Sequence, residues 1–245
     1  MAYAYWKSSL HTRDAAFHLF FRRPPFHGGF TIAAGLENLI SFIENFRFEE
    51  SDLKYLEGIK NSEGLPYFDT SFLDMLQKLR LSVSIDEVPE GTPVFPYEPL
   101  LRVEGPILQC QLLETPLLNL INFPTLIATK AARVCLAAQG DPVMEFGVRR
   151  AQGIDGAITA SRAAYIGGCS STSNVLAGKI FGIPVQGTQA HSWVMAFEEE
   201  EEAFLTYAKI LPDACVLLVD TYDTIAGVKK AIKVGNWLKS QGKKL

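Results

Sequence analysis

Three short apolar segments, each ending in a polar turn, constrain the fold of this 245-residue chain more than any other feature. They occupy residues 143–146, 183–186 and 215–219, and stretches with helical patterns separate them. Continuous apolar strands that alternate with helices are typical of parallel sheets covered on both faces. The chain after Gly105, which begins with a long helical run to about Gln139, is therefore predicted to form a parallel sheet or an α/β barrel.

The first 105 residues follow another pattern. Alternating apolar side chains and proline or glycine turns predict short strands, and apolar residues at helical spacing predict amphipathic helices. The strands are expected at 16–22, 30–33, 82–85, 92–95 and 100–103, and the helices at 36–46, 51–58 and 70–78. The fold class is thus α/β, with an N-terminal mixed α+β domain at 1–105 and a second domain at 106–245.

Composition narrows the partners and the location. The net charge is −4 and the basic residues are scattered, so a nucleic-acid partner is not expected. The apolar stretch 107–127 contains Gln, Glu and Asn side chains and two prolines, which favours a buried helix over a membrane span. The first residues show no export signal, and the four cysteines are far apart, so we expect a cytoplasmic protein with reduced thiols and no zinc site.

The turn after the first apolar segment carries an aromatic ring and two cations. Phe146 is followed by Gly147, and Arg149 and Arg150 come next. A guanidinium donates two parallel hydrogen bonds to a phosphate or pyrophosphate, so this turn suits an anionic ligand. Taken alone, a core Phe146 and surface ion pairs of the two arginines explain the pattern better.

The turn after the second apolar segment carries His191 and Ser192, just past Gly187 and Thr188. A histidine at a partly enclosed turn serves as a base, an acid or a nucleophile. A lone histidine is often structural, so the residues leave both interpretations open at similar weight.

The third apolar segment delivers Asp220 into its turn, with Asp223 close behind. A carboxylate at this position suits the orientation of His191 or the binding of a metal-bearing phosphate. The simpler interpretation is an N-cap, by Asp220 or Thr221, of a helix at 226–238, and both are possible together. The acidic run 198–202 is interpreted as a solvated helix start, with negative charge at the positive end of the helix.

Segment 167–178 is rich in glycine and small hydroxyl residues, which suits an anion, but it lacks the lysine and the glycine spacing of nucleotide-binding loops. Together with the three turns it resembles the nicotinate phosphoribosyltransferases, a family of type II phosphoribosyltransferases. The resemblance rests on four ordered motifs and on shorter matches that extend it over nearly the whole chain. The motifs lie at 145–153, 170–178, 187–192 and 218–222, and the shorter matches at 20–23, 88–91, 112–116 and 131–133.

The resemblance implies an irregular α/β barrel after the N-terminal domain, and a homodimer with active sites between subunits. It implies nicotinate and phosphoribosyl pyrophosphate as substrates, Mg²⁺ as the metal, and ATP hydrolysis coupled to formation of nicotinate mononucleotide. By this resemblance Phe146 lies against a face of the pyridine ring and Arg149 lies near the ring and the phosphates. His191 is then the histidine that ATP phosphorylates transiently, Asp220 the carboxylate that orients it, and Ser192 a neighbouring binding residue.

Thr172, Ser173 and Asn174 lie where the related nicotinamide enzyme carries an aspartate that faces the carboxamide. Neutral donors suit the carboxylate of nicotinate, which an aspartate would repel. The chain departs from the family at both ends: the threonine-aspartate-leucine-tyrosine segment is absent, as are the later barrel strands and the loops that hold the 5′-phosphate. We therefore expect an incomplete barrel. The alternatives are a catalytically inactive fragment of that enzyme, or a related phosphoribosyltransferase that acts on nicotinamide or quinolinate.

Overall fold

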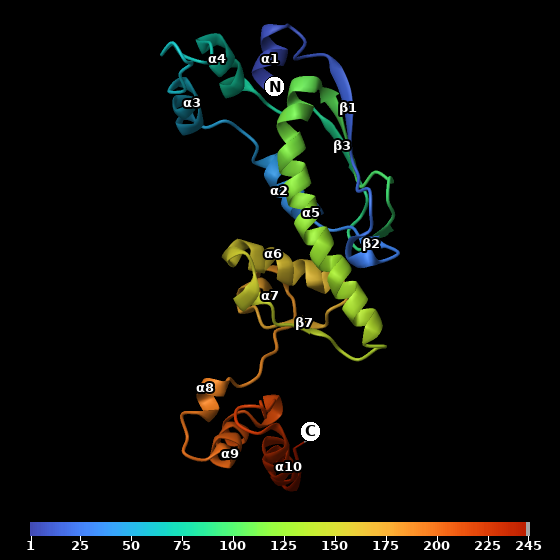
Figure 1. Cartoon of the computed structure of the whole chain (residues 1–245), viewed down its shortest axis with the longest axis vertical. Helices are drawn as coiled ribbons and strands as arrows, with labels where there is room; N and C mark the ends of the chain where they lie inside the picture. Colours follow the sequence, from blue (N-terminus) through green and yellow to red (C-terminus); the bar gives the residue numbers. More distant parts are fainter. Residues whose placement is uncertain (244–245) are drawn as a thin grey trace. The chain divides into compact units, whose positions relative to one another are not determined.

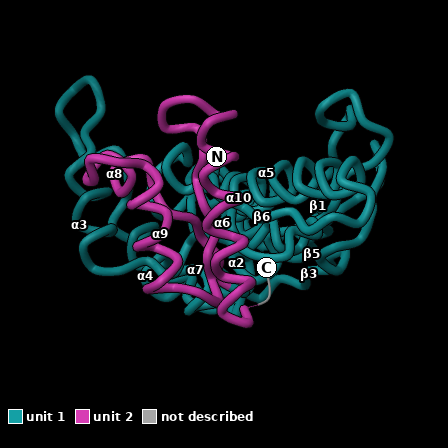
Figure 2. Tube along the Cα trace, turned by 90° about the horizontal axis from the view of Figure 1, so that it is seen from below, with its two compact units in different colours: residues 1–184 teal, residues 185–245 magenta. Residues whose placement is uncertain are grey.

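The computed structural model describes residues 1–243 and divides the chain into two compact units, Met1–Pro184 and Val185–Leu245 (Figures 1 and 2). Helices and short strands occur together, which confirms the mixed α/β class. The predicted boundary between residues 105 and 106 lies inside the first unit, and it stays a prediction.

The N-terminal part of the first unit is built around a small antiparallel sheet. Its strands lie in the order β1-β5-β3, with Asp14 opposite Pro106 and Ser84 opposite Glu104. A second pair, β2 with β4, is also antiparallel. The elements of this part are α1 (Ala2–Lys7), β1 (Asp14–Leu19), β2 (Thr31–Ile32), α2 (Leu36–Glu44), α3 (Glu50–Glu57), α4 (Thr70–Lys78), β3 (Ser84–Glu87), β4 (Pro93–Val94) and β5 (Leu101–Pro106). Every predicted strand and helix of this part has a counterpart here, within a few residues at the ends.

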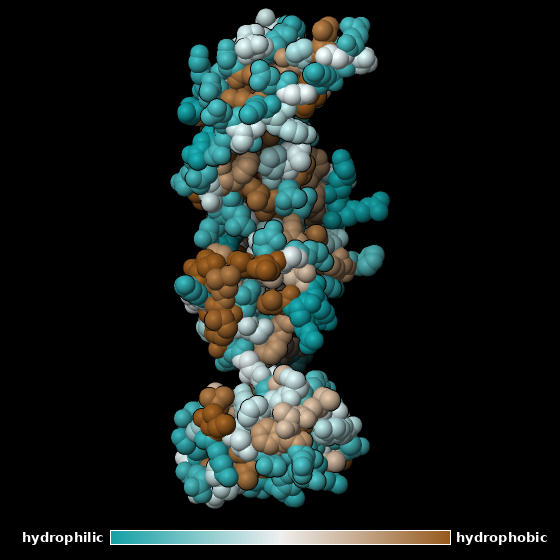
Figure 3. Space-filling view, turned by 90° about the vertical axis from the view of Figure 1, so that its left-hand side faces the viewer, coloured by the Kyte–Doolittle hydropathy of each residue, from teal (hydrophilic) through white to brown (hydrophobic). Residues whose placement is uncertain are grey.

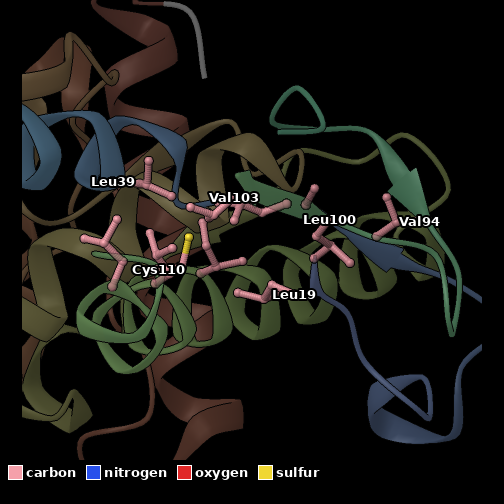
Figure 4. Close-up of a cluster of buried hydrophobic side chains, with 11 residues drawn as sticks. Leu19, Leu39, Val94, Leu100, Val103 and Cys110 are labelled. Carbon is pink, nitrogen blue, oxygen red and sulfur yellow. The ribbon is translucent and has the colours of Figure 1, made fainter. Parts of the chain in front are cut away.

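The long helix α5 (Ile107–Ala137) contacts this sheet and is the centre of the first unit. Leu113, Leu117 and Ile121 of α5 are buried against side chains of β1 and β5, as the close-up in Figure 4 shows for the same cluster. Among residues 1–243, α5 is the one helix long and apolar enough to cross a membrane by length and composition. Its buried contacts with the sheet and with α6 are those of a core helix, which was the prediction.

The chain after α5 forms β6 (Met144–Glu145), α6 (Gly153–Ile166), β7 (Ser171–Thr172) and α7 (Val175–Phe181). Strands β6 and β7 pair in parallel. Helix α6 lies across α5, and a Cβ atom at Gly167 would come within 2.4 Å of the carbonyl oxygen of Ala128. From the sequence a helix is expected only near 161–166, but α6 begins eight residues earlier, at Gly153, because the glycines at its start obscure the helical pattern.

The second unit contains α8 (His191–Val194), α9 (Glu200–Ile210) and α10 (Thr224–Ser240). Val194, Phe204 and Val234 are among its buried core residues. The predicted strands at 183–186 and 215–219 are absent as regular strands. A regular strand needs a ladder of hydrogen bonds to a neighbour. Segment 183–186 accepts a backbone bond from β7, from the N–H of Thr172 to the carbonyl of Pro184 at 3.0 Å, and the N–H of Gln189 bonds to the carbonyl of Val216 at 3.5 Å.

The acidic run does begin a helix, since Glu200, Glu201 and Glu202 form the first turn of α9. The expectation that this run is solvated was wrong for Glu200, whose side chain is 2% exposed and pairs with Lys230 at 3.1 Å. Exposed apolar side chains occur on both units, among them Ile154, Val175, Ile225 and Ile232. On the face drawn in Figure 3, apolar residues gather in patches.

Candidate functional site

The predicted binding residues of the first unit gather where β6 and β7 end, and we call Phe146, Arg149 and residues 172–174 the β6–β7 site. In the parallel register Glu145 lies beside Thr172. Oε2 of Glu145 accepts hydrogen bonds from Oγ1 of Thr172 at 2.7 Å and from Oγ of Ser161 at 2.9 Å. The backbone N–H of Gly147 bonds to Oε1 of Glu145, and the N–H of Ser173 donates to the carbonyl of Glu145 at 2.9 Å. One glutamate therefore joins both turns and α6.

Thr172 and Asn174 are used by the protein itself. Thr172 is fully buried, and its Oγ1 also accepts the N–H of Asn174 at 3.0 Å. Asn174 caps α7 by accepting the N–H of Ala177 at 3.2 Å, while its amide group donates to Oγ of Ser161 at 3.2 Å. The two side chains therefore hold the turn in shape and have little capacity left for a ligand.

Ser173, Phe146 and Arg149 are the members of this site that face outward. Phe146 is 37% exposed, Arg149 is exposed, and Ser173 is partly exposed. In the part of the chain that the structure describes, no hydrogen bond of the Ser173 hydroxyl is found. The site thus offers an aromatic face, a cation and a neutral donor.

The second predicted pair lies in the second unit, and we call His191, Ser192 and Asp220 the His191 site. His191 begins α8, and its Nε2 atom lies 3.3 Å from Oδ1 of Asp220. Both side chains are more than half exposed, at 54% and 56%, and Ser192 is exposed beside them. A carboxylate at this distance fixes the orientation of an imidazole and raises its nucleophilicity.

Local features explain why Asp220 is available to His191. The N-cap of α10 is Asp223, whose Oδ1 accepts the N–H of Ala226 at 2.7 Å, so the predicted cap by Asp220 or Thr221 was wrong. Gly227 lets α10 approach the preceding segment so closely that a Cβ atom there would lie 2.2 Å from the carbonyl oxygen of Val219. Asp220 is therefore held at the end of that segment by backbone packing.

Gln189 ties the two turns of the His191 site together. It is 5% exposed, its N–H donates to the carbonyl of Val216, and its side-chain amide donates to the carbonyl of Leu218 at 3.4 Å. Sequence reasoning assigned no role to Gln189, Glu145 or Ser161. Glu145 and Gln189 lie within the motifs at 145–153 and 187–192. A single sequence does not reveal which motif residues bond to the protein itself and which are left for a ligand.

The four cysteines are free, as expected. Burial raises the pKa of the Cys169 thiol to about 12, and the neighbouring Cys135 contributes in the same direction. A thiol of this kind stays protonated and is a poor nucleophile, which leaves His191 as the better candidate.

Among residues 1–243, no group of three His, Cys, Asp or Glu side chains is placed to hold a metal ion by itself. Mg²⁺ usually keeps several waters and binds through one or two carboxylates together with substrate phosphates. The exposed carboxylate of Asp220 suits a Mg²⁺ ion that is held by one carboxylate together with substrate phosphates.

Comparisons with known proteins cover both sites. A family model described as the nicotinate phosphoribosyltransferase N-terminal domain matches residues 1–122, and one described as the nicotinate phosphoribosyltransferase family matches residues 142–239. The nicotinate phosphoribosyltransferase of Bacillus subtilis is 48% identical over 235 residues, which make up 96% of this chain and 46% of that protein. The chain spans about half the length of the curated relatives it matches.

Solved structures agree with the sequence matches. The crystal structure of human nicotinic acid phosphoribosyltransferase matches with a TM-score of 0.85 and 35% identity, over 97% of this chain and 57% of that one. Nicotinate-nucleotide pyrophosphorylase from Pyrococcus furiosus matches with a TM-score of 0.71 and 25% identity, over 95% of this chain and 51% of that one. The chain thus has the fold of a phosphoribosyltransferase. Since two family models cover most of its length, it belongs to the nicotinate phosphoribosyltransferase family.

Proposed function

We propose that this chain supplies the pyridine-binding and phosphate-accepting parts of a cytoplasmic nicotinate phosphoribosyltransferase in NAD salvage. The reaction joins nicotinate to phosphoribosyl pyrophosphate, releases pyrophosphate and is coupled to ATP hydrolysis. The observation that carries the proposal is the 3.3 Å contact between His191 and Asp220, the two residues that the family resemblance assigns to phosphoryl transfer.

The β6–β7 site would bind nicotinate. The exposed ring of Phe146 offers a stacking face for the pyridine, and Arg149 offers a cation for the anionic ligand and for the phosphates. Of residues 172–174, Ser173 is the one whose hydroxyl is left for the nicotinate carboxylate, since Thr172 and Asn174 bond within the turn. Their part in binding would therefore be to hold Ser173 in place.

The glycosyl step needs positioning more than acid–base chemistry. The ring nitrogen of nicotinate attacks C1 of the phosphoribosyl group as the bond to pyrophosphate breaks, through a transition state with oxocarbenium character. Arg149 would neutralise part of the charge on the departing pyrophosphate. Mg²⁺, carried by the phosphates, would supply the remaining positive charge.

The ATP step would use the His191 site. With the Asp220 carboxylate 3.3 Å from Nε2, a proton held on Nε2 would leave the Nδ1 lone pair to attack the γ-phosphorus, and the bond to ADP would break. Both side chains are more than half exposed, which leaves room for ATP and later for hydrolysis of the phosphohistidine. A homodimer and a barrel completed by further strands belong to the same proposal.

The experiment measures nicotinate binding to the purified chain by calorimetry, with nicotinamide and quinolinate as competitors. Nicotinate is expected to bind best, and Ser173→Asp to weaken it about tenfold or more, because the new carboxylate repels the ligand. Ser170→Asp, which adds the same charge at an exposed nearby position, is the matched control and should change affinity much less. Preferential binding of nicotinamide or quinolinate to the unmodified chain would refute the proposal.

A further inference from the structure

The Glu145 carboxylate works as an acceptor of several hydrogen bonds at once. Thr172 and Ser161 each have one hydroxyl proton, and each hydroxyl oxygen already accepts a bond, from the N–H of Asn174 at 3.0 Å and from its side-chain amide at 3.2 Å. The Thr172 proton therefore points at Oε2 of Glu145, at 2.7 Å, while the Ser161 proton is shared between Oε2 of Glu145 and the carbonyl of Ala157, both at 2.9 Å. A glutamine in this position has one acceptor oxygen, and its NH₂ group would face other donors.

A second, independent feature of the sequence fits this arrangement. The carboxylate folds back over its own turn and bonds to the N–H of Gly147. A Cβ atom at position 147 would lie 2.8 Å from Oε1 of Glu145, closer than the two atoms can approach. A side chain at 147 would therefore push the Glu145 carboxylate away from this N–H, so glycine at 147 suits the folded-back position of the carboxylate.

The bonds of Glu145 join the two segments that the proposed function uses. Phe146 and Arg149 follow Glu145 directly, and Ser173 is attached through its N–H to the Glu145 carbonyl at 2.9 Å. Ser161 adds a bond to the middle of α6, a helix that packs on α5. Removing the acceptor at 145 would loosen the side-chain bonds that fix the first turn to Thr172 and Ser161, while leaving the backbone pairing of β6 with β7 in place.

We propose that Glu145 is a positioning residue, which holds the Phe146–Arg149 turn against Ser173 so that the aromatic face and the hydroxyl donor meet the same nicotinate molecule. This inference rests on the proposed function of the β6–β7 site. Glu145 acts through its neighbours and does not touch the substrate itself. Its carboxylate is turned toward its own donors, Thr172, Ser161 and the N–H of Gly147, which stabilise its charge.

The test compares variants of the whole chain. Glu145→Gln removes one acceptor, Thr172→Val removes one donor, and Thr172→Ser keeps the hydroxyl and serves as the rescue. Glu104→Gln is the matched control, because Glu104 is an exposed glutamate paired with Arg102. Each variant is measured for nicotinate affinity by calorimetry, for hydrogen exchange of the peptides 145–150 and 171–175, and for labelling of His191 by [γ-³²P]ATP.

Glu145→Gln and Thr172→Val are expected to weaken nicotinate binding about tenfold, as loss of a charge-assisted hydrogen bond does, and to speed exchange in both peptides. Thr172→Ser and Glu104→Gln should stay within about twofold of the unmodified chain. Labelling of His191, which lies in the other compact unit, should be unchanged in all four variants.

The outcomes separate this inference from the proposed function. Unchanged affinity and exchange in Glu145→Gln, with normal nicotinate binding by the unmodified chain, overturn the inference alone. An unmodified chain that binds no nicotinate overturns the proposed function and the positioning role with it. Equal losses of nicotinate binding and of His191 labelling, not restored in Thr172→Ser, would assign Glu145 to general stability and would also overturn the inference.

Discussion

The β6–β7 site and the His191 site are held in opposite ways. In the first, Thr172 is fully buried, Asn174 is nearly so, and the polar side chains satisfy one another through Glu145. In the second, His191 and Asp220 are both more than half exposed and meet through a single contact of 3.3 Å. A buried and satisfied polar network fixes one geometry, whereas an exposed pair can turn. The difference suits a site that recognises one rigid ring and a site whose histidine gains and loses a phosphoryl group.

The largest expected effect follows from breaking the buried ion pair between Glu200 and Lys230, in the unit that carries the His191 site. Glu200 is 2% exposed and pairs with Lys230 of α10, so Lys230→Met would leave a buried carboxylate without its partner. We expect the free energy of unfolding of the second unit to fall by about 3 kcal/mol or more. The control is Lys233→Met, which breaks the exposed pair with Glu201 and should cost less than about 1 kcal/mol. Chemical denaturation followed by hydrogen exchange of residues 200–240 measures both, and equal costs would contradict this account.

An effect of intermediate size is expected when one glycine in each unit is replaced by alanine. Gly227→Ala should cost about 1–3 kcal/mol and move Asp220 away from His191, because the new Cβ atom would meet the Val219 carbonyl at 2.2 Å. Gly156→Ala in α6 is the matched change, where the nearest atom is Cβ of Gln152 at 3.9 Å. It should instead stabilise the first unit by up to about 1 kcal/mol, through helix propensity. Thermal unfolding of both variants checks the opposite signs, and destabilisation by Gly156→Ala would show that the packing of α6 is misjudged.

The smallest expected effect is a pH dependence of stability that is confined to the first unit. Burial raises the pKa of Glu87 to about 7, with a further contribution from the neighbouring Glu90, and one of its oxygens is buried without a partner. Because the folded pKa lies above the ordinary 4.5, the stabilising protonated form is present below pH 4.5 and is lost as the pH rises through about 7. Glu87→Gln should therefore stabilise the first unit at pH 8 by on the order of 1 kcal/mol and change little at pH 4. Urea denaturation at the two pH values measures this, and an equal gain at both would exclude the titration of Glu87.

The sequence predicted the elements whose signal is local. The period of apolar residues located α2, α4 and α10 to within a few residues, and the order of the motifs located His191 and Asp220 in adjoining turns. The strands predicted at 183–186 and 215–219 failed because a regular strand needs a full ladder of bonds to a neighbour, which an apolar pattern does not reveal. Segment 183–186 lies beside β7, where the carbonyl of Pro184 accepts the N–H of Thr172 at 3.0 Å, but it forms no regular strand. The N-cap is Asp223 and not Asp220 or Thr221 because α10 begins at Thr224, so that the Asp223 carboxylate reaches the N–H of Ala226.

The residues of the β6–β7 site were likewise only partly predictable from the sequence. Residue type alone favoured a core Phe146 and surface ion pairs of the arginines, and only the family resemblance suggested Phe146, Arg149 and Ser173 as ligand contacts. The structure leaves these three facing outward. Thr172 and Asn174 carry neutral hydrogen-bond donors, as Ser173 does, but both side chains form their hydrogen bonds within the protein. Burial decides between these alternatives, and burial depends on the packing of α6 and β7.

The most direct test is incubation of the purified chain with [γ-³²P]ATP and Mg²⁺, followed by analysis of the bound phosphoryl group. The account predicts an acid-labile, base-stable label that is absent in His191→Ala, strongly reduced in Asp220→Asn and retained in Glu145→Gln. A label that persists in His191→Ala, or one that depends on Glu145 as much as on His191, would contradict the assignment of phosphoryl transfer to the His191 site.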